Sequence, residues 1–234
     1  MSPRPTSIQD CFAKRKREGQ GVLIPYLTAG YPDPETSLEL MHSVASAGAD
    51  ILELGIPFSD PLADGPTIQR SSFRALEAGM TVAGTLDLLR AFRERHDLPV
   101  VLFTYLNPVL QFGIDAFLSD AEEAGGQGLL LTDLPAGADW ELENRIISSK
   151  LDLIRLLAPT TPVHRIPEVA KGGSGFLYYI SRTGVTGAQQ DLRTDLRQEV
   201  EAVREKVELP IAVGFGISTP EQAAMVSGLS EGVV

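Results

Sequence analysis

Short apolar runs that alternate with amphipathic stretches constrain the fold of this chain more than any other feature of its sequence. Seven runs rich in branched and aromatic residues are typical of buried strands. They cover residues 22–27, 51–56, 100–105, 128–132, 152–157, 176–180 and 210–214, and residues 232–234 can begin an eighth. Mostly apolar strands that are each followed by a helix indicate a parallel sheet with helices on both faces.

Helical patterns fill the intervals between these strands. They cover residues 35–48, 68–78, 83–95, 114–125, 138–149, 164–171, 190–206 and 220–228. A short helix is also expected at about residues 7–17, where Ser7 can cap the first turn and Ile8, Cys11 and Phe12 fall on one face. Most strands are therefore one βα unit apart, and only the interval after 51–56 holds an additional loop and helix.

The number of these units separates two α/β architectures. An open dinucleotide-binding sheet would carry a G-x-G-x-x-G turn after the first strand, and the sequence has none there. Seven units with an eighth begun suit a (β/α)8 TIM barrel. We therefore predict an α/β protein in which residues 1–234 form one barrel domain whose eighth unit is truncated.

Charge and cysteine content exclude several classes of partner. The net charge of −11 argues against nucleic acid or an anionic membrane as a ligand. The one basic run, Lys14 to Arg17, is better explained as the solvated face of a short helix. Cys11 is the only cysteine, so no internal disulfide can form. Without a signal-like or membrane-spanning apolar segment, a soluble cytoplasmic protein is expected.

The second predicted strand carries a carboxylate, Glu53, within an otherwise apolar run. Alternate side chains of a barrel strand point inward, so Glu53 faces the barrel interior if Leu52 and Leu54 face the helices. Its place in the latter half of the strand brings it to the end where barrel active sites lie. Removal from water should raise its pKa toward the range useful for proton transfer. The alternative is a structural ion pair, although no inward base is evident on neighbouring strands.

Two further carboxylates follow strands at the same end of the barrel. Asp64 lies in the loop PLADGPT, and taken alone Asp64-Gly65 is ordinary turn chemistry. Beside an inward Glu53, it is better explained as the second member of an acid–base pair. Asp133 comes directly after strand 128–132, where it can be catalytic or can equally cap a helix or anchor a loop.

Glycine-rich segments follow the sixth and seventh predicted strands. These are SRTGVTGAQ (181–189) and GFGIS (214–218), and Thr219-Pro220 has the residue types of an N-cap and a first helical position. Backbone N–H groups of such loops bind phosphate, and barrels often place this site after strands seven and eight. Peptide dipoles would allow an acidic protein to hold an anionic substrate.

Aromatic residues gather near the same strand ends, where they can be core or can contact a flat apolar ligand. They are Tyr26, Phe103, Tyr105, Tyr178 and Phe215. The three histidines, His42, His96 and His164, have no spacing typical of metal ligands, so no metal site is predicted.

The motif LELGIPFSDPLADGPTIQ resembles the signature of the tryptophan synthase alpha chain family, whose members are (β/α)8 lyases. The resemblance continues through IPYLTAGYPDP (24–34), TYLNPVLQFGID (104–115), LLLTDLP (129–135), SRTGVTGA (181–188) and VGFGIS (213–218). It implies retro-aldol cleavage of indole-3-glycerol phosphate to indole and glyceraldehyde 3-phosphate.

The resemblance also implies roles for individual residues. Glu53 matches the family's general acid–base and Asp64 its second catalytic carboxylate. Gly187 and Gly216 match phosphate-binding glycines. Positions around the substrate are matched by Tyr26, Thr28, Phe103, Tyr178 and Phe215, and we expect Tyr105 and, from the loop tip, Thr186 to join them. No cofactor is expected in this chain, because pyridoxal phosphate belongs to the beta chain, the family's partner in an α2β2 heterotetramer.

Three other functions remain as alternatives. A stand-alone indole-releasing lyase would have the same site without a partner. Another phosphate-binding barrel enzyme, such as a sugar-phosphate isomerase or decarboxylase, would carry an inward lysine at a strand end, and none is found. A binding module without activity would dispense with Glu53 and Asp64.

Family members continue beyond the eighth strand with a Gly-Ser turn and a helix, whereas the sequence here stops at Val234. We expect a native chain about thirty residues longer. A barrel without most of its eighth strand would leave its first and seventh strands with open edges.

Overall fold

The computed structural model describes residues 7–181, 189–214 and 216–234. Its strands form one sheet and are β1 Val22–Leu23, β2 Tyr26–Thr28, β3 Leu52–Gly55, β4 Val100–Thr104, β5 Gly128–Leu131, β6 Asp152–Leu157, β7 Leu177–Ile180, β8 Ile211–Gly214 and β9 Gly232–Val233. The helices are α1 Ile8–Glu18, α2 Pro34–Ser46, α3 Pro66–Glu77, α4 Val82–Arg93, α5 Leu106–Phe112, α6 Ile114–Glu123, α7 Trp140–Ile147, α8 Ile166–Ala170, α9 Gln189–Arg204 and α10 Pro220–Ser227. Among these helices, none is long and apolar enough to cross a membrane.

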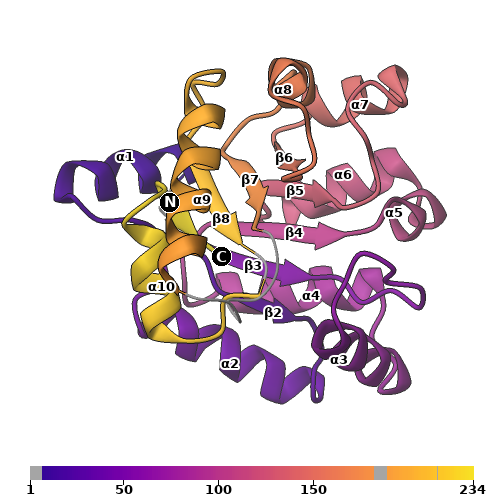
Figure 1. Cartoon of the computed structure of the whole chain (residues 1–234). Coiled ribbons are helices and arrows are strands. Elements are labelled where there is room, and N and C mark those ends of the chain that lie inside the picture. Colours follow the sequence, from indigo (N-terminus) through magenta and orange to yellow (C-terminus); the bar gives the residue numbers. More distant parts are fainter. Residues whose placement is uncertain (1–6, 182–188, 215) are drawn as a thin grey trace.

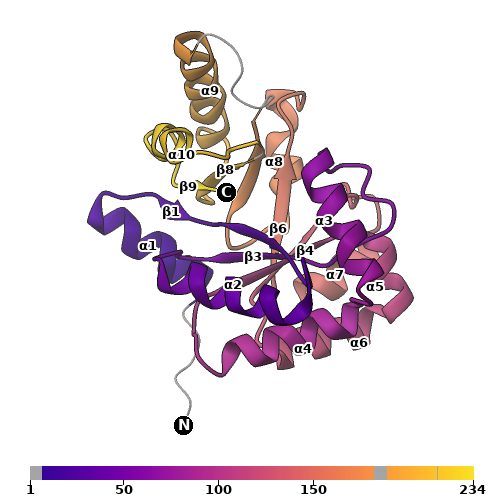
Figure 2. The same ribbon diagram turned by 90° about the horizontal axis from the view of Figure 1, so that it is seen from below.

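The strand order closes the sheet into a barrel. Neighbouring strands are all parallel, in the order β1-β9-β8-β7-β6-β5-β4-β3-β2. Because β1 and β2 are successive pieces of one strand, this order returns to its starting point. Figure 1 shows the helices arranged around the outside of the strands, and Figure 2 shows α2 and α4 side by side against this wall. The predicted α/β barrel is therefore confirmed.

The first strand is divided, whereas the sequence predicted one strand over 22–27. Pro25 lies at the break and has no N–H to donate to a sheet. Its carbonyl nevertheless accepts a hydrogen bond of 3.0 Å from Glu53 N, so the chain stays attached to β3. The division lets β1 pair with β9 while β2 pairs with β3.

The expected open edges between the first and seventh predicted strands are not found. Val22 pairs with Gly232, and Ala212 of β8 pairs with the same glycine from the other side. Ile24 N donates to Val233 O, and Val234 N donates to Val213 O, each over 2.9 Å. The two paired residues of β9 bridge β1 and β8, so the expectation of open edges was wrong where these strands pair.

Helix boundaries differ from the predicted ranges in two informative places. Helix α5 was not predicted, because it begins directly after β4 and contains Pro108, which is tolerated only near a helix start. The helix predicted at 164–171 is instead a 3₁₀ turn at Val163–Arg165 followed by α8, with Pro167 in its first turn. The short first helix agrees with its prediction, since Ser7 caps it and Ile8 and Phe12 are buried.

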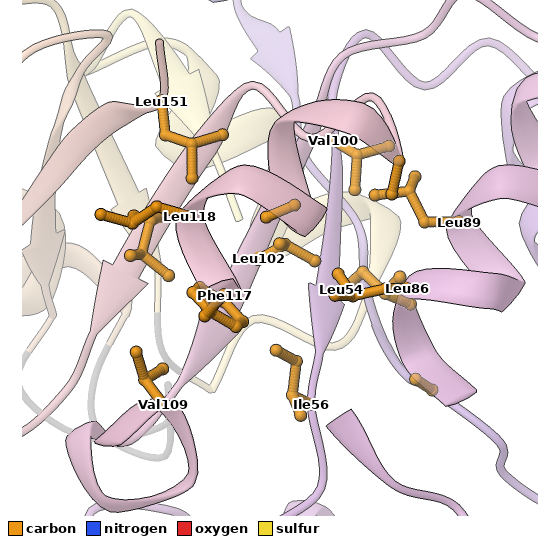
Figure 3. Close-up of a cluster of buried hydrophobic side chains, with 14 of the residues drawn as sticks. Leu54, Ile56, Leu86, Leu89, Val100, Leu102, Val109, Phe117, Leu118 and Leu151 are labelled. Atoms are coloured by element: carbon orange, nitrogen blue, oxygen red, sulfur yellow. The ribbon is translucent and has the colours of Figure 1, made fainter. Parts of the chain in front are cut away.

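Three apolar clusters pack against the barrel wall, one inside it and two outside it. The interior core includes Ile51, Val101 and Leu130, and α1 contributes Ile8 and Phe12 to it. The outer core lies between β3 to β5 and their helices, where Figure 3 shows Leu54 and Leu102 against Leu86 and Phe117. The second outer cluster packs α8, α9 and α10 against β7 and β8. Neighbouring residues of one strand thus belong to different cores, as the period of two requires.

Candidate active site

Glu53 lies on the inner face of β3. Its neighbours Leu52 and Leu54 belong to the outer core, while Ile51 belongs to the interior core. In the sheet Glu53 is in register with Tyr26 of β2 and Val101 of β4. Its side chain is 1% exposed. The inward orientation predicted from the strand period is therefore confirmed.

Burial makes the Glu53 carboxyl a weaker acid than an exposed glutamate. Desolvation raises the pKa of its carboxyl from 4.5 to about 8, and the charge of Asp64 contributes in the same direction. Within the described residues, Oε1 has no hydrogen-bond partner and no ion pair includes Glu53. This carboxyl is therefore not part of a structural ion pair in this part of the chain, and it can hold or release a proton near neutral pH.

Asp64 is held at the end of a short loop that runs from β3 to α3. The Tyr105 hydroxyl donates a hydrogen bond of 3.0 Å to Asp64 Oδ2, and Asp64 N donates to Pro61 O over 3.0 Å. The backbone carbonyl of Asp64 accepts from Gln69 Nε2 over 2.9 Å. Burial raises the pKa of Asp64, while the Tyr105 hydrogen bond opposes that rise. The loop thus presents a carboxylate with a dedicated donor.

Tyr105 is itself fixed from two sides. Its hydroxyl oxygen accepts a hydrogen bond of 2.9 Å from Ala63 N, and its ring lies 5.2 Å from that of Phe58. Burial, followed by the charge of Asp64, raises the pKa of Tyr105 to about 12. The phenol therefore stays protonated and remains a donor to Asp64. Figure 1 shows α3 and α5 together at the end toward which the arrows of β3 and β4 point.

Two tyrosines occupy equivalent places on opposite sides of the barrel. The Tyr26 ring lies 5.4 Å from that of Phe103, edge to face, and covers Gly55 of the next strand. In the same way, the Tyr178 ring of β7 covers Gly214 of the adjacent strand β8. A Cβ on either glycine would collide with the tyrosine hydroxyl, so a larger residue would force the tyrosine ring to move. Phe103 of β4 and Tyr178 of β7 belong to the interior core, and Tyr26 of β2 packs against Phe103.

Of the roles that the sequence left open for Asp133, the structure shows that of anchoring a helix. Its side chain is exposed, and its Oδ1 accepts a hydrogen bond of 2.7 Å from Leu106 N in the first turn of α5. A carboxylate here satisfies an N–H that the helix cannot, and it complements the helix dipole. Asp133 therefore anchors α5, directly after Tyr105.

The predicted phosphate site is only partly described. Thr186, Gly187 and Phe215 lie outside the described residues. Gly216 has φ of +79°, which favours glycine, and it precedes α10. Thr219 is the N-cap of this helix, as the sequence predicted, and it forms a capping box with Gln222. Phosphate binding at Gly187 and Gly216 stays a prediction.

Sequence reasoning missed Ser71, which lies buried on α3 with its Oγ 2.6 Å from Thr28 Oγ1. A serine at a buried helix position was the only available signal.

The histidines do not form a metal site within the described chain, where no cluster of three metal-ligating side chains occurs. His42 and His96 instead stack with Phe92, at ring separations of 5.6 and 5.0 Å.

Comparison with known proteins gives one consistent result. Residues 12–234 match the family model described as tryptophan synthase alpha chain. The tryptophan synthase alpha chain of Citrifermentans bemidjiense is 49% identical over 227 residues, which are 97% of this chain and 85% of the relative. That of Gluconobacter oxydans is 46% identical over 228 residues, covering 97% of this chain and 84% of the relative.

Solved structures agree in fold. Tryptophan synthase subunit alpha from Legionella pneumophila superposes with a TM-score of 0.88 at 39% identity, covering 97% of this chain and 84% of that one. A chain of Mycobacterium tuberculosis tryptophan synthase gives 0.88 at 35% identity, covering 97% and 86%. With its sequence signature, its barrel and these relatives in agreement, this chain belongs to the tryptophan synthase alpha chain family.

Proposed function

We propose that this chain catalyses the alpha reaction of its family, the retro-aldol cleavage of indole-3-glycerol phosphate to indole and glyceraldehyde 3-phosphate. One observation carries the proposal: Glu53 is buried on the inner face of β3, with a pKa raised to about 8 by desolvation and by Asp64. A carboxyl with this pKa can take and give protons at neutral pH.

Glu53 is the general acid–base. Cleavage of the bond to indole C3 requires a proton on C3, and the side-chain hydroxyl must lose its proton to become an aldehyde. One carboxyl can serve both transfers if it is half protonated near the working pH, as the pKa of about 8 allows. The absence of a hydrogen-bond partner at Oε1 within the described residues leaves this atom available to the substrate.

Asp64 stabilises the charge that this protonation creates. A proton on C3 makes the indole ring cationic at nitrogen, and a carboxylate that accepts the ring N–H offsets that charge. The Tyr105 hydroxyl binds only Oδ2 of Asp64, so it leaves the other carboxylate oxygen to accept the indole N–H. The Tyr105 hydrogen bond favours the ionised form of Asp64, since it opposes the rise in pKa that burial causes.

The remaining predicted residues are proposed to form the walls of the site. Tyr26, Phe103 and Tyr178 offer aromatic surface to the indole ring, and Thr28 and Tyr105 offer hydroxyl groups. Gly187 and Gly216 would bind the phosphate, with Thr186 and Phe215 nearby.

No step of this mechanism requires a cofactor in this chain. Members of the family work with a beta chain that holds pyridoxal phosphate, and the proposed assembly is the α2β2 heterotetramer. A cytoplasmic location is part of the same proposal and is in keeping with a buried, unpaired Cys11.

Indole release from indole-3-glycerol phosphate tests the proposal, measured with and without a beta chain. The wild-type chain should release indole, and the beta chain should increase the rate. Asp133→Asn provides a matched control for substitutions of the active carboxylates, because Asp133 lies at the same end of the barrel but anchors α5. Wild-type protein that releases no indole under either condition would contradict the proposal.

A further inference from the structure

A buried hydrogen bond between two hydroxyl groups joins β2 to α3, and the mechanism above does not use it. Thr28 Oγ1 and Ser71 Oγ lie 2.6 Å apart, and the two residues are 6% and 8% exposed. Ser71 Oγ also lies 2.9 Å from Ile68 O, and Thr28 Oγ1 lies 3.5 Å from the Tyr26 hydroxyl. Buried hydroxyl groups have no water to replace a lost partner, so this chain of contacts constrains both elements.

Each end of this chain of hydroxyls belongs to an element next to one of the two carboxylates. On the strand side, Tyr26 is in register with Glu53. On the helix side, α3 begins at Pro66, two residues after Asp64, and its N-cap Gly65 offers no side-chain cap. The Thr28–Ser71 contact therefore connects the strand beside Glu53 to the helix that carries the Asp64 loop.

The number of hydroxyl hydrogens also couples the directions of the hydrogen bonds along the chain. Each hydroxyl has a single hydrogen. If Ser71 donates to Thr28, Thr28 can donate to the Tyr26 hydroxyl. If Ser71 instead donates to Ile68 O, Thr28 must donate to Ser71 and can only accept from Tyr26. The bond that Ser71 donates therefore determines whether the Tyr26 hydroxyl accepts a hydrogen bond from Thr28 or donates one to it.

We propose that Ser71 is a positioning residue of the alpha reaction, which acts through Thr28 to hold the Asp64 loop against β2 and to orient the Tyr26 hydroxyl beside Glu53. The inference rests on the proposed function and extends it to a residue that does not touch the substrate. Its effect should appear in kcat, because the two carboxylates must be placed correctly in the transition state.

Steady-state kinetics of Ser71→Ala, Thr28→Val and the double variant test whether the two residues act together. Ser71→Ala should lower kcat about 10-fold, within the range expected for a disturbed catalytic geometry. The double variant should be no slower than Thr28→Val alone, because Ser71 acts only through Thr28. Ser72→Ala is the matched control, since Ser72 is the adjacent serine of α3 and is 3% exposed. It should keep the wild-type kcat.

The pH–rate profile gives a second readout that a loss of stability alone would not change. The titratable groups in electrostatic contact around Glu53 and Tyr26 are Asp64 and Tyr105, and the charge of Asp64 raises the pKa of Glu53. If Ser71→Ala loosens the Asp64 loop, the pKa of Glu53 falls from about 8, and the limb of the profile that titrates with Glu53 moves to lower pH. Ser72→Ala should leave that limb in place.

The outcomes separate this inference from the function on which it rests. Wild-type protein without indole release overturns both. Active wild-type protein together with a Ser71→Ala variant that matches Ser72→Ala in kcat and pH profile overturns the role of Ser71 alone. So does a double variant in which the two single effects multiply, since Ser71 would then act independently of Thr28.

Discussion

Two buried glutamates show how differently the interior and the outer layer of this barrel treat a carboxylate. Glu53 lies inside the barrel and is 1% exposed, whereas Glu143 of α7 lies in the helix layer and is 3% exposed. Glu143 forms an ion pair with Arg155 of β6 and accepts a hydrogen bond of 2.7 Å from Gly137 N. Glu53 has no such partner for Oε1 among the described residues.

The difference separates a structural carboxylate from a reactive one. A buried carboxylate that is paired with a base and accepts an N–H has its charge and hydrogen bonds satisfied. Removal of that carboxylate leaves the base buried without a partner. A buried carboxyl without a partner is held in its neutral form by desolvation, so it destabilises the fold whenever it ionises. We expect Glu143 to matter for stability and Glu53 for activity.

The largest effect is expected from Glu53→Gln, which should lower kcat about 10²–10⁴-fold because it removes the general acid–base. Substrate binding should change little, since the amide has the same shape. The folded state should be at least as stable as wild type above neutral pH, where the native carboxyl must ionise in a dry site. Indole release and urea unfolding of the same preparation measure both quantities. Retention of more than a tenth of the wild-type kcat would exclude Glu53 from the role.

Glu143→Ala should show the reverse pattern. Removal of one partner from a buried ion pair costs about 3–5 kcal/mol, because Arg155 would remain buried and uncompensated. The activity of the molecules that remain folded should match wild type. Chemical unfolding and an active-site titration of folded protein separate the two quantities. A variant with wild-type stability and lowered kcat would remove the distinction between the two glutamates.

The pH dependence of stability should also distinguish Glu53. Its pKa is raised from 4.5 in an ordinary environment to about 8 in the folded chain. Between these values the folded chain keeps a proton that the unfolded chain has released, so stability falls as pH rises, by about 1.4 kcal/mol per pH unit from this group. Glu53→Gln should remove this contribution. Parallel stability curves for the two proteins from pH 5 to 8 would show that the pKa is not raised.

The smallest effect is expected from Tyr105→Phe. The variant loses the donor to Asp64 and the acceptor for Ala63 N while the contact with Phe58 remains. Without the donor the pKa of Asp64 rises further, so kcat/KM should fall about 10-fold and the acid limb of the pH–rate profile should move to higher pH. Tyr31→Phe, at a tyrosine that is 40% exposed, is the control. An unchanged acid limb would mean that Tyr105 does not set the charge of Asp64.

The inward position of Glu53 could be predicted because it depends only on the two-residue period of a strand. The barrel followed from the same local patterns. Contacts between residues distant in sequence could not be predicted this way. The hydrogen bond from Tyr105 to Asp64 joins residues 41 positions apart, and that between Thr28 and Ser71 joins residues 43 positions apart.

Local chemistry explains the other differences between sequence and structure. Asp133 had two possible roles, and only the position of Leu106 N distinguished them. Helix α5 escaped prediction because it follows β4 without the usual turn. The roles of Thr186, Gly187 and Phe215 remain predictions.

The divided first strand has a consequence for the order of folding. The chain is made from its N-terminus, so β2 can meet β3 soon after both leave the ribosome. β1 must wait for β9, because Val22 pairs with Gly232, which lies 210 positions later in the sequence. Contacts between such distant residues form slowly, since the entropy of loop closure opposes them until the rest of the wall is in place. Closure of the barrel at β1 and β9 is therefore expected to be its last folding event.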